Sequence, residues 1–321
     1  MKKRAALVVL TFLFSVLSLR MSAQPTTPAA DLKAQFEKRV HEIAARVDGV
    51  VGYSIVDPTS GERVGRLESA TFPTASAIKL AIVYELFKQA EEQKIRLTDM
   101  VTLDRAQAVG GTGVLVEMGT PTLSIRDYAV LMVTLSDNTA TNILIDRLGM
   151  ARIAARMRAL GLNGTKLRRH MMDTAAARRG DENVSTPDEL ARLLEAMHGP
   201  LAGPAKAGAD GPAKAGGDGP AKAGHYAMTD AIELLKKPKE NRLRKGLPEG
   251  VQSADKSGEL EGVRVDAGIV FARNRPYVLS VMTTFLKDEA EGERAIEQIS
   301  RAAYEYFSRL GAGGALGRLL P

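Results

Sequence analysis

Strand patterns occur near the two ends of this chain, and a long helical block separates them. Alternating and β-branched runs between turn residues predict strands at 50–56 and 62–67, and again at about 251–257, 263–272 and 276–285. This placement predicts one sheet that is assembled from both ends of the chain. The expected fold class is α+β, in a three-layer α/β/α arrangement with an inserted all-helical lobe.

Helical periodicity and helix-end signals occupy most of the remaining chain. Ser124 begins a capping box of the Ser-x-x-acid kind and a helix to about Leu135, and Thr186 begins another helix with proline at its first position. Residues 162–185 lack periodicity and predict a long loop, which in a compact domain is usually functional. Further helices are expected at about 31–47, 76–93, 150–160 and 289–310, with one ending at Leu148 and one or two before Arg244.

The first residues show a pattern typical of export. A basic start, Met1-Lys2-Lys3-Arg4, precedes an apolar run and the small residue Ala23, so residues 1–23 are expected to be a signal peptide. The apolar run is shorter than a bilayer-spanning helix requires, which argues against a membrane anchor. Residues 24–310 are then expected to form one domain, followed by a flexible tail at 311–321.

Composition excludes several function classes. The chain has no cysteine, so it cannot form a disulfide, use a thiolate nucleophile or carry a lipid on cysteine, and a periplasmic or secreted protein is expected. The net charge of +6 falls to +2 without the four cations of residues 1–23, which gives no argument for nucleic-acid binding. With no tryptophan and 5% aromatic residues, stacking platforms for bases are not expected either.

Two glycine-rich segments are not expected to bind a ligand. Residues 200–224 repeat the GPAKAG motif, and such a composition cannot bury enough surface to become ordered, so a disordered surface insertion is expected. The segment Gly110-Gly111-Thr112-Gly113 lacks the lysine and hydroxyl ending of a phosphate loop. It is therefore expected to be a flexible turn.

A serine and a lysine one helical turn apart form the first candidate for chemistry. If Ser76 begins its helix, Lys79 lies on the same face three residues later. A serine hydroxyl needs a neighbouring base, and a lysine in a partly desolvated pocket can become that base. The helix start also turns the NH of Ser76 outwards, where it can stabilise an oxyanion. Taken alone, the pair is equally compatible with a helix cap followed by a solvated charge.

Histidine-based alternatives have little support in the sequence. The four histidines are scattered, without an HExxH motif or a close pair, so neither a zinc centre nor any cofactor is expected. No GxSxG motif surrounds a serine, which disfavours a serine–histidine–aspartate triad.

Three motifs occur in order and together favour catalysis: Ser-x-x-Lys at 76–79, Ser-Asp-Asn at 136–138 and Lys-Ser-Gly at 256–258. This trio resembles the penicillin-recognising serine hydrolases, and its spacing resembles most the class A β-lactamases. The resemblance covers nearly all of the chain after residue 23 except the 200–224 insertion. It implies a β-lactamase/transpeptidase-like fold with an antiparallel five-stranded sheet.

Each motif residue has a chemical role that these groups can perform. Ser76 attacks an activated amide carbonyl, Lys79 takes or relays the proton, and Ser136 can pass a proton to the departing nitrogen. The remaining groups are expected to bind substrate: the Asn138 amide holds a side-chain carbonyl, Lys256 and Ser257 hold a carboxylate, Gly258 lets substrate lie close to its strand, and the NH of Glu259 completes the oxyanion hole.

Two nearby charges have open roles in the sequence. Asp137 is expected either to shape the loop around it or to take a direct part in the site. Arg264, on the neighbouring strand, is either a clamp for the substrate carboxylate or a solvated charge.

One stretch departs from the family pattern at a position that matters. Class A β-lactamases carry a loop glutamate that activates the water releasing the acyl-enzyme. In the matching stretch, Met171 stands in place of that glutamate and Ala175 in place of an asparagine. Asp173 is the nearest carboxylate and is a candidate for the deacylation base; Glu182 is a more distant one. Asp173 is equally suited to pairing with Arg169 or its neighbour Arg168.

The sequence therefore leaves three functions open. The leading hypothesis is a monomeric serine β-lactamase that hydrolyses a β-lactam amide through a Ser76 acyl-enzyme. The second is a penicillin-binding or DD-peptidase-like hydrolase of cell-wall peptides, favoured by the missing glutamate. The third is a receptor that binds β-lactams covalently, which no signalling domain supports.

Overall fold

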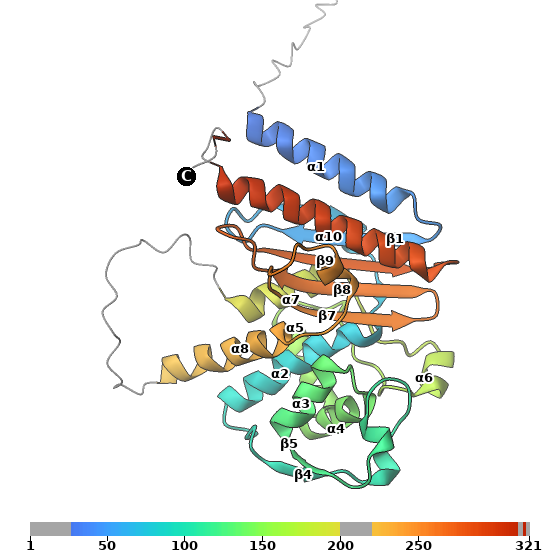
Figure 1. The fold of residues 1–321 in the computed structure, drawn as a ribbon. Helices are drawn as coiled ribbons and strands as arrows, with labels where there is room; N and C mark the ends of the chain where they lie inside the picture. The colour runs from blue at the N-terminus through green and yellow to red at the C-terminus, as the bar shows by residue number, and fades with distance from the viewer. Residues whose placement is uncertain (1–26, 200–219, 314–316, 319–321) are drawn as a thin grey trace, which may run out of the picture.

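The computed structural model describes residues 27–199, 220–313 and 317–318, with the backbone alone for 220–227. Its centre is an antiparallel five-stranded sheet in the order β2-β1-β9-β8-β7 (Figure 1). The strands come from both ends of the chain, as predicted: β1 (Val50–Val56), β2 (Arg63–Arg66), β7 (Ser253–Leu260), β8 (Val263–Val270) and β9 (Tyr277–Thr284).

Helices from both ends of the chain cover one face of the sheet. Helices α1 (Pro28–Ala45) and α10 (Glu289–Ala312) lie together there (Figure 1), and their buried aromatic rings stack between them, with the Phe36 and Tyr306 centroids 4.4 Å apart. Most of the rest of this core comes from β1, β8 and β9, together with Leu243 and Ala272. The expected three-layer α+β arrangement is confirmed.

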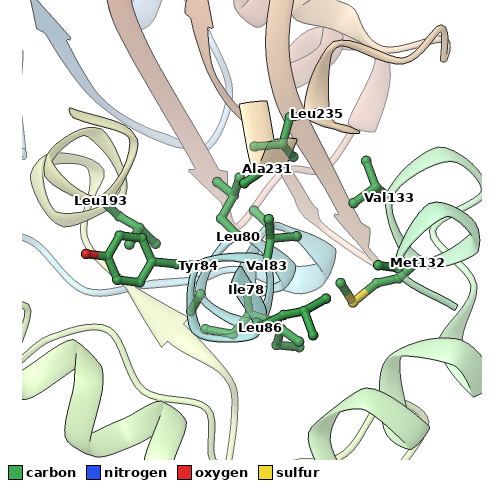
Figure 2. Close-up of a cluster of buried hydrophobic side chains, with 14 of the residues drawn as sticks. Ile78, Leu80, Val83, Tyr84, Leu86, Met132, Val133, Leu193, Ala231 and Leu235 are labelled. Carbon is green, nitrogen blue, oxygen red and sulfur yellow. The ribbon is translucent and has the colours of Figure 1, made fainter. Parts of the chain in front are cut away.

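The opposite face of the sheet carries the helical lobe, and helix α2 (Lys79–Glu91) lies at its centre. Figure 2 shows apolar side chains of α2 and of the turn before it meeting side chains of α3, α7 and α8. Leu80 and Leu86 are fully buried, and burial of each contributes about 1.5–3 kcal/mol. This packing fixes the start of α2, and with it the positions of Ser76 and Lys79.

The remaining elements complete the helical lobe and its edges. The helices are α3 (Ile125–Thr134), α4 (Asn138–Leu148), α5 (Met150–Ala159), α6 (Thr174–Arg178), α7 (Pro187–His198), α8 (Pro220–Lys236) and α9 (Arg242–Lys245). Two further two-stranded sheets pair β3 (Phe72–Pro73) with β6 (Val184–Ser185), and β4 (Met100–Thr102) with β5 (Thr122–Ser124). The 3₁₀ turns are η1 (Ala75–Ile78), η2 (Arg105–Gln107) and η3 (Leu115–Glu117).

Predicted helix starts are confirmed where a side chain caps them. Ser124 and Asp127 form both bonds of the capping box, and the Thr186 hydroxyl accepts from the Glu189 NH at 3.1 Å. Gly149 closes α4 in the left-handed region, with φ 83°. Such caps depend on a few neighbouring residues, so a sequence reveals them directly.

Two segment predictions are wrong. The predicted loop at 162–185 contains α6 and β6, because α6 needs only five residues and β6 forms by pairing with distant Phe72 and Pro73. The strand predicted at 251–257 runs instead from Ser253 to Leu260, because pairing with β8 continues to Leu260 opposite Val263. The pairing of β6 with β3 joins segments far apart in the chain, so it leaves no local pattern.

The predicted signal peptide and residues 200–219 lie outside the described residues, as does most of the predicted tail. Helix α8 begins at Pro220, inside the last residues of the predicted 200–224 insertion, and α10 extends into the tail as far as Ala312. The domain bounds stay predictions. Within the described ranges, no helix has the length and apolar character needed to cross a membrane.

Candidate active site

Ser76 lies in a tight turn between the sheet and α2. The 3₁₀ turn η1 precedes α2, and Ala75 adopts φ 46°, a left-handed conformation that is strained for a residue with a Cβ. Such strain persists only where surrounding packing enforces it. The helix predicted to begin at Ser76 is confirmed, because η1 leads directly into α2; its first turn is a 3₁₀ turn rather than an α-helical one.

Gly258 on β7 packs directly behind this turn. A Cβ on Gly258 would lie 2.5 Å from the Thr74 carbonyl oxygen and 2.9 Å from the Ser76 nitrogen, distances that backbone atoms cannot tolerate. The glycine is thus needed for the strand to approach the turn. Gly258 also lines the cleft described below, so the expectation that it lets substrate lie close to its strand stays a prediction.

The Lys79 amine joins two of the three motifs. Its Nζ lies 3.0 Å from Ser76 Oγ, 3.0 Å from Ser136 Oγ, 2.7 Å from the Ser136 carbonyl oxygen and 3.2 Å from Asn138 Oδ1. The side chain is fully buried, and its hydrogen-bond acceptors among the described residues are two hydroxyls, a backbone carbonyl and an amide oxygen, all uncharged. The amine can therefore exchange a proton with either serine hydroxyl directly.

Burial lowers the pKa of Lys79 well below its ordinary value. The largest cause is desolvation, the positive charge of Lys256 lowers the pKa further, and Asp137 opposes both. A lower pKa increases the fraction of neutral amine near pH 7, and only the neutral form can accept a proton.

The Ser136–Asn138 segment is held by its own loop contacts. Ser136 has φ 53°, in the strained left-handed region, and Asn138 donates to the Gly110 carbonyl at 3.1 Å. Asp137 is buried, caps α4, and accepts from the NH groups of Val114 and Leu115 at 2.7 and 2.9 Å. The predicted loop-shaping role of Asp137 is confirmed by these contacts.

Lys256 supplies a second buried cation. It lies on β7, an edge strand as predicted, and its Nζ donates to the Ser257 carbonyl at 2.7 Å. Desolvation, followed by repulsion from Lys239, lowers the pKa of Lys256 to about 8. It is therefore a cation at neutral pH that lies next to the site.

A cleft of about 620 Å³ opens over these groups. Ser76, Ser136 and Asn138 line it together with Ser257, Gly258 and Glu259, so the structure gathers the three motifs around one space. Gly111 and Thr112 line it as well. The glycine-rich segment that was expected to be a plain turn is thus a wall of the cleft, anchored by Thr112 Oγ1 donating to the Ser136 carbonyl at 2.7 Å.

Met171 lines the same cleft and is 7% exposed. Asn142 fixes its backbone, with Oδ1 accepting from the Met171 NH at 2.8 Å and Nδ2 donating to its carbonyl at 3.1 Å. Sequence reasoning missed Asn142, which lies one helical turn after Asn138 on α4, a spacing that could have indicated it. The place predicted for a water-activating glutamate therefore presents a thioether.

The two candidate carboxylates of this loop are engaged elsewhere. Asp173 caps α6 by accepting from the Ala176 NH at 2.9 Å, and it is not among the residues lining the cleft. Glu182 lines the cleft but accepts from Arg169 Nη2 at 2.7 Å. Arg169 thus pairs with Glu182, not with Asp173 as one alternative expected, and Asp173 as deacylation base stays a prediction.

Arg264 and the Glu259 side chain point away from the cleft. Arg264 Nε donates to Glu293 Oε1 at 2.9 Å on α10, so it is neither a free clamp nor a solvated charge. The Glu259 carboxylate pairs with Arg242. The role predicted for its backbone NH in the oxyanion hole stays a prediction. Among the described residues, no cluster of histidine and acidic side chains could hold a metal ion.

Comparison with known proteins agrees with this geometry. A family model described as the β-lactamase enzyme family matches residues 35–209 and 225–307. β-Lactamase SME-1 of Serratia marcescens is 24% identical, with 92% of this chain and 96% of that protein aligned.

Solved structures agree as well. A β-lactamase from Sphaerobacter thermophilus has 28% identity and a TM-score of 0.71, with 84% of this chain and 96% of that one covered. PBP-A has 25% identity and a TM-score of 0.71, with coverage of 85% and 96%. Since the family model spans most of the chain, the protein belongs to the β-lactamase enzyme family, within the class A and penicillin-recognising serine hydrolase group.

Proposed function

We propose that this protein is a serine β-lactamase that opens the β-lactam amide through a Ser76 acyl-enzyme. The observation that carries the proposal is the Lys79 amine, 3.0 Å from both Ser76 Oγ and Ser136 Oγ and depressed in pKa by burial. One residue can therefore accept the proton of the nucleophile and pass it to the group that protonates the leaving nitrogen.

The reaction follows from these positions. Ser76 Oγ bonds to the amide carbonyl carbon while its proton moves to Lys79 Nζ, and the NH groups of Ser76 and Glu259 stabilise the resulting oxyanion. The C–N bond then breaks, and the nitrogen takes the Ser136 hydroxyl proton, which Lys79 replaces. Water must then hydrolyse the Ser76 ester to complete turnover.

Substrate binding is assigned to the remaining motif groups. Lys256 and the Ser257 hydroxyl bind a carboxylate of the substrate, and Asn138 Nδ2 donates a hydrogen bond to a carbonyl of the substrate's side chain. The site needs no cofactor. The predicted signal peptide and the family support a periplasmic or secreted location. We also propose that the protein is a monomer.

A second function is a penicillin-binding or DD-peptidase-like protein that releases its acyl group slowly. Met171 favours it, because a thioether cannot accept a proton from water at the place where the resemblance requires a carboxylate. The two functions share the acylation step and differ in the hydrolysis of the ester.

Intact-mass measurement over time after adding a penicillin tests both. A Ser76 adduct that decays with release of opened penicillin is expected for the lactamase, and a lasting adduct would favour the second function. Ser76→Ala should form no adduct, and Ser60→Ala, at an exposed turn outside the cleft, should behave as wild type. Absence of an adduct on the wild-type protein would reject both functions.

The pKa of Lys256 predicts a pH limit for substrates that carry a carboxylate. A lysine with pKa about 8 is charged below that pH and neutral above it. The second-order acylation rate should therefore fall above about pH 8, by up to about tenfold per pH unit. Stopped-flow acylation from pH 6 to 10 measures it.

Lys256→Arg provides the control, because arginine stays charged through this range. The fall above pH 8 should disappear in this variant, whatever its absolute rate. An unchanged fall would show that another group causes it.

A further inference from the structure

A cluster of charged side chains surrounds strand β7, and only one of its members belongs to the three motifs. Four of these side chains are no more than 5% exposed, and the fifth, that of Arg244, is 23% exposed. The β7 charge cluster consists of Lys239, Arg244, Asp255, Lys256 and Asp266. Three cations therefore share two carboxylates, and one positive charge has no counter-charge within the cluster.

Asp255 lies at the centre of the cluster and is bound from several sides. Arg244 Nε donates to its Oδ2 at 2.8 Å, and the Ser253 hydroxyl donates to the same oxygen at 2.6 Å. Asn241 Nδ2 donates to the other oxygen, Oδ1. Lys239 Nζ lies 3.6 Å from this Oδ1. Lys239 is thus a second cation on a carboxylate that Arg244 already neutralises.

Backbone contacts hold the Lys239 amine in this place. Its Nζ donates to the Leu235 carbonyl and, at 3.3 Å, to the Lys237 carbonyl, beside the last turn of α8. Carbonyls at the end of a helix carry partial negative charge and favour a cation there. Desolvation is the largest influence on Lys239 and lowers its pKa to about 8. At neutral pH the cluster therefore contains this additional buried charge.

Asp266 is the second carboxylate, and it compensates the cations only in part. Its Oδ2 accepts from the Leu243 NH at 3.0 Å, whereas its buried Oδ1 has no hydrogen-bond partner among the described residues. Burial, followed by the charge of Asp255, raises the pKa of Asp266 to about 7. A carboxyl group with this pKa is partly protonated and uncharged near neutral pH.

Lys256 is the cation of the cluster that the motifs place at the site, and it directly follows Asp255 in the chain. Desolvation is the largest cause of its lowered pKa, and repulsion from Lys239 is the next. Lys79 of α2 is a further cation within electrostatic reach, because Lys256 lowers its pKa. The carboxylates that oppose these effects on Lys256 belong to Asp266, Asp255 and Glu259.

We propose that Lys239 is a positioning residue that acts through Lys256, and that its charge limits the pH range in which the cleft accepts a carboxylate-bearing substrate. This inference rests on the proposed function, in which Lys256 binds the substrate carboxylate. Two like charges in a water-poor region repel strongly, and loss of a proton from either relieves the repulsion. Lys256 is charged below its pKa, so without Lys239 it should keep its proton to a higher pH.

The first test compares a penicillin with its methyl ester, which has no carboxylate charge. The ratio of their Ser76 acylation rates, measured by stopped flow from pH 6 to 10, reports the charge of Lys256, because titration of Lys79 affects both compounds. In the wild-type protein the ratio should fall with a midpoint at about pH 8. Lys239→Met keeps the length of the stem and should raise this midpoint by at least about one pH unit.

Two further variants separate charge from packing. Lys239→Arg retains a cation that stays charged through this range, so its midpoint should not exceed that of the wild-type protein. Lys237→Met is the matched control, because Lys237 is an exposed lysine two residues earlier, and it should keep the wild-type midpoint. An unchanged midpoint in Lys239→Met, or an equal rise in Lys239→Arg, would overturn the inference.

A direct titration distinguishes this inference from the proposed function. The NMR signal of the Lys256 amine in lysine-labelled protein, identified by its loss in Lys256→Met, reports the charge of Lys256 without any β-lactam. A higher titration midpoint in Lys239→Met would support the effect of Lys239 even if no penicillin acylated Ser76, a result that would reject the proposed function alone. An unchanged NMR midpoint would overturn the inference, while acylation of Ser76 would still support the function.

Discussion

Replacement of Lys79 by methionine is expected to slow acylation of Ser76 by about 10²–10⁴-fold, the usual contribution of a general base. Methionine matches the length of the buried lysine stem and leaves no proton acceptor between Ser76 and Ser136. The measurement is single-turnover acylation by a chromogenic β-lactam. A rate within about threefold of wild type would remove Lys79 from the proton transfer.

The control for this prediction lies on the same helix. Lys88 is part of α2, is 25% exposed at its side chain and pairs with Glu91 at 2.6 Å. Lys88→Met should acylate at the wild-type rate. Thermal unfolding of both variants separates chemistry from stability, because Lys79→Met also removes the donor to the Ser136 carbonyl and Asn138 Oδ1.

The sequence was sufficient to predict which residues contact Lys79, because each is marked locally. Ser76 and Lys79 are one turn apart, and Ser136 and Asn138 bracket a helix start, so short-range spacing implies proximity. Convergence of the three motifs needed the family resemblance. The structure then added what joins them: one buried amine that contacts both serines.

The cleft walls could not be predicted because their contacts are long-range. Gly111 and Thr112 were expected to form a plain turn, and only the fold places them beside Asn138. Arg264 was expected at the site or in solvent, but Glu293 on the last helix of the chain binds it. Asn142 supports Met171 across 29 positions of sequence. The partners in each pairing lie far apart in the sequence, so no local pattern predicts which residues meet.

At position 171 both the sequence and the structure indicate that a water-activating carboxylate is missing. The resemblance assigns its position to a water-activating carboxylate, and the structure places its side chain in the cleft that Ser76 lines. Because the Asn142 amide binds the backbone of residue 171 on both sides, a new side chain there should keep the same direction. The backbone at position 171 is thus held in a position suited to a general base, but its methionine side chain cannot act as one.

Met171→Glu is therefore expected to accelerate hydrolysis of the Ser76 acyl-enzyme by about 10²–10⁴-fold while acylation changes little. The carboxylate supplies a proton acceptor beside the ester, and its partial burial should raise its pKa towards neutrality, which suits a general base. Decay of the penicillin adduct, followed by intact mass between pH 5 and 9, measures the rate. The rate should rise with pH as the glutamate ionises.

Three companion variants make this test specific. Met171→Gln has the shape of the glutamate without a base, and Met118→Glu places a carboxylate outside the cleft, so neither should accelerate release. Asp173→Asn in the wild-type background should slow release if Asp173 acts as the native base; an unchanged rate would leave Asp173 as the cap of α6 alone. If Met171→Glu and Met171→Gln released the acyl group at equal rates, the acceleration would come from easier access of water to the ester and not from an added base. The carboxylate at position 171 is expected to matter because the proposed acylation step uses other residues, whereas release of the acyl group requires that a water beside the ester lose its proton.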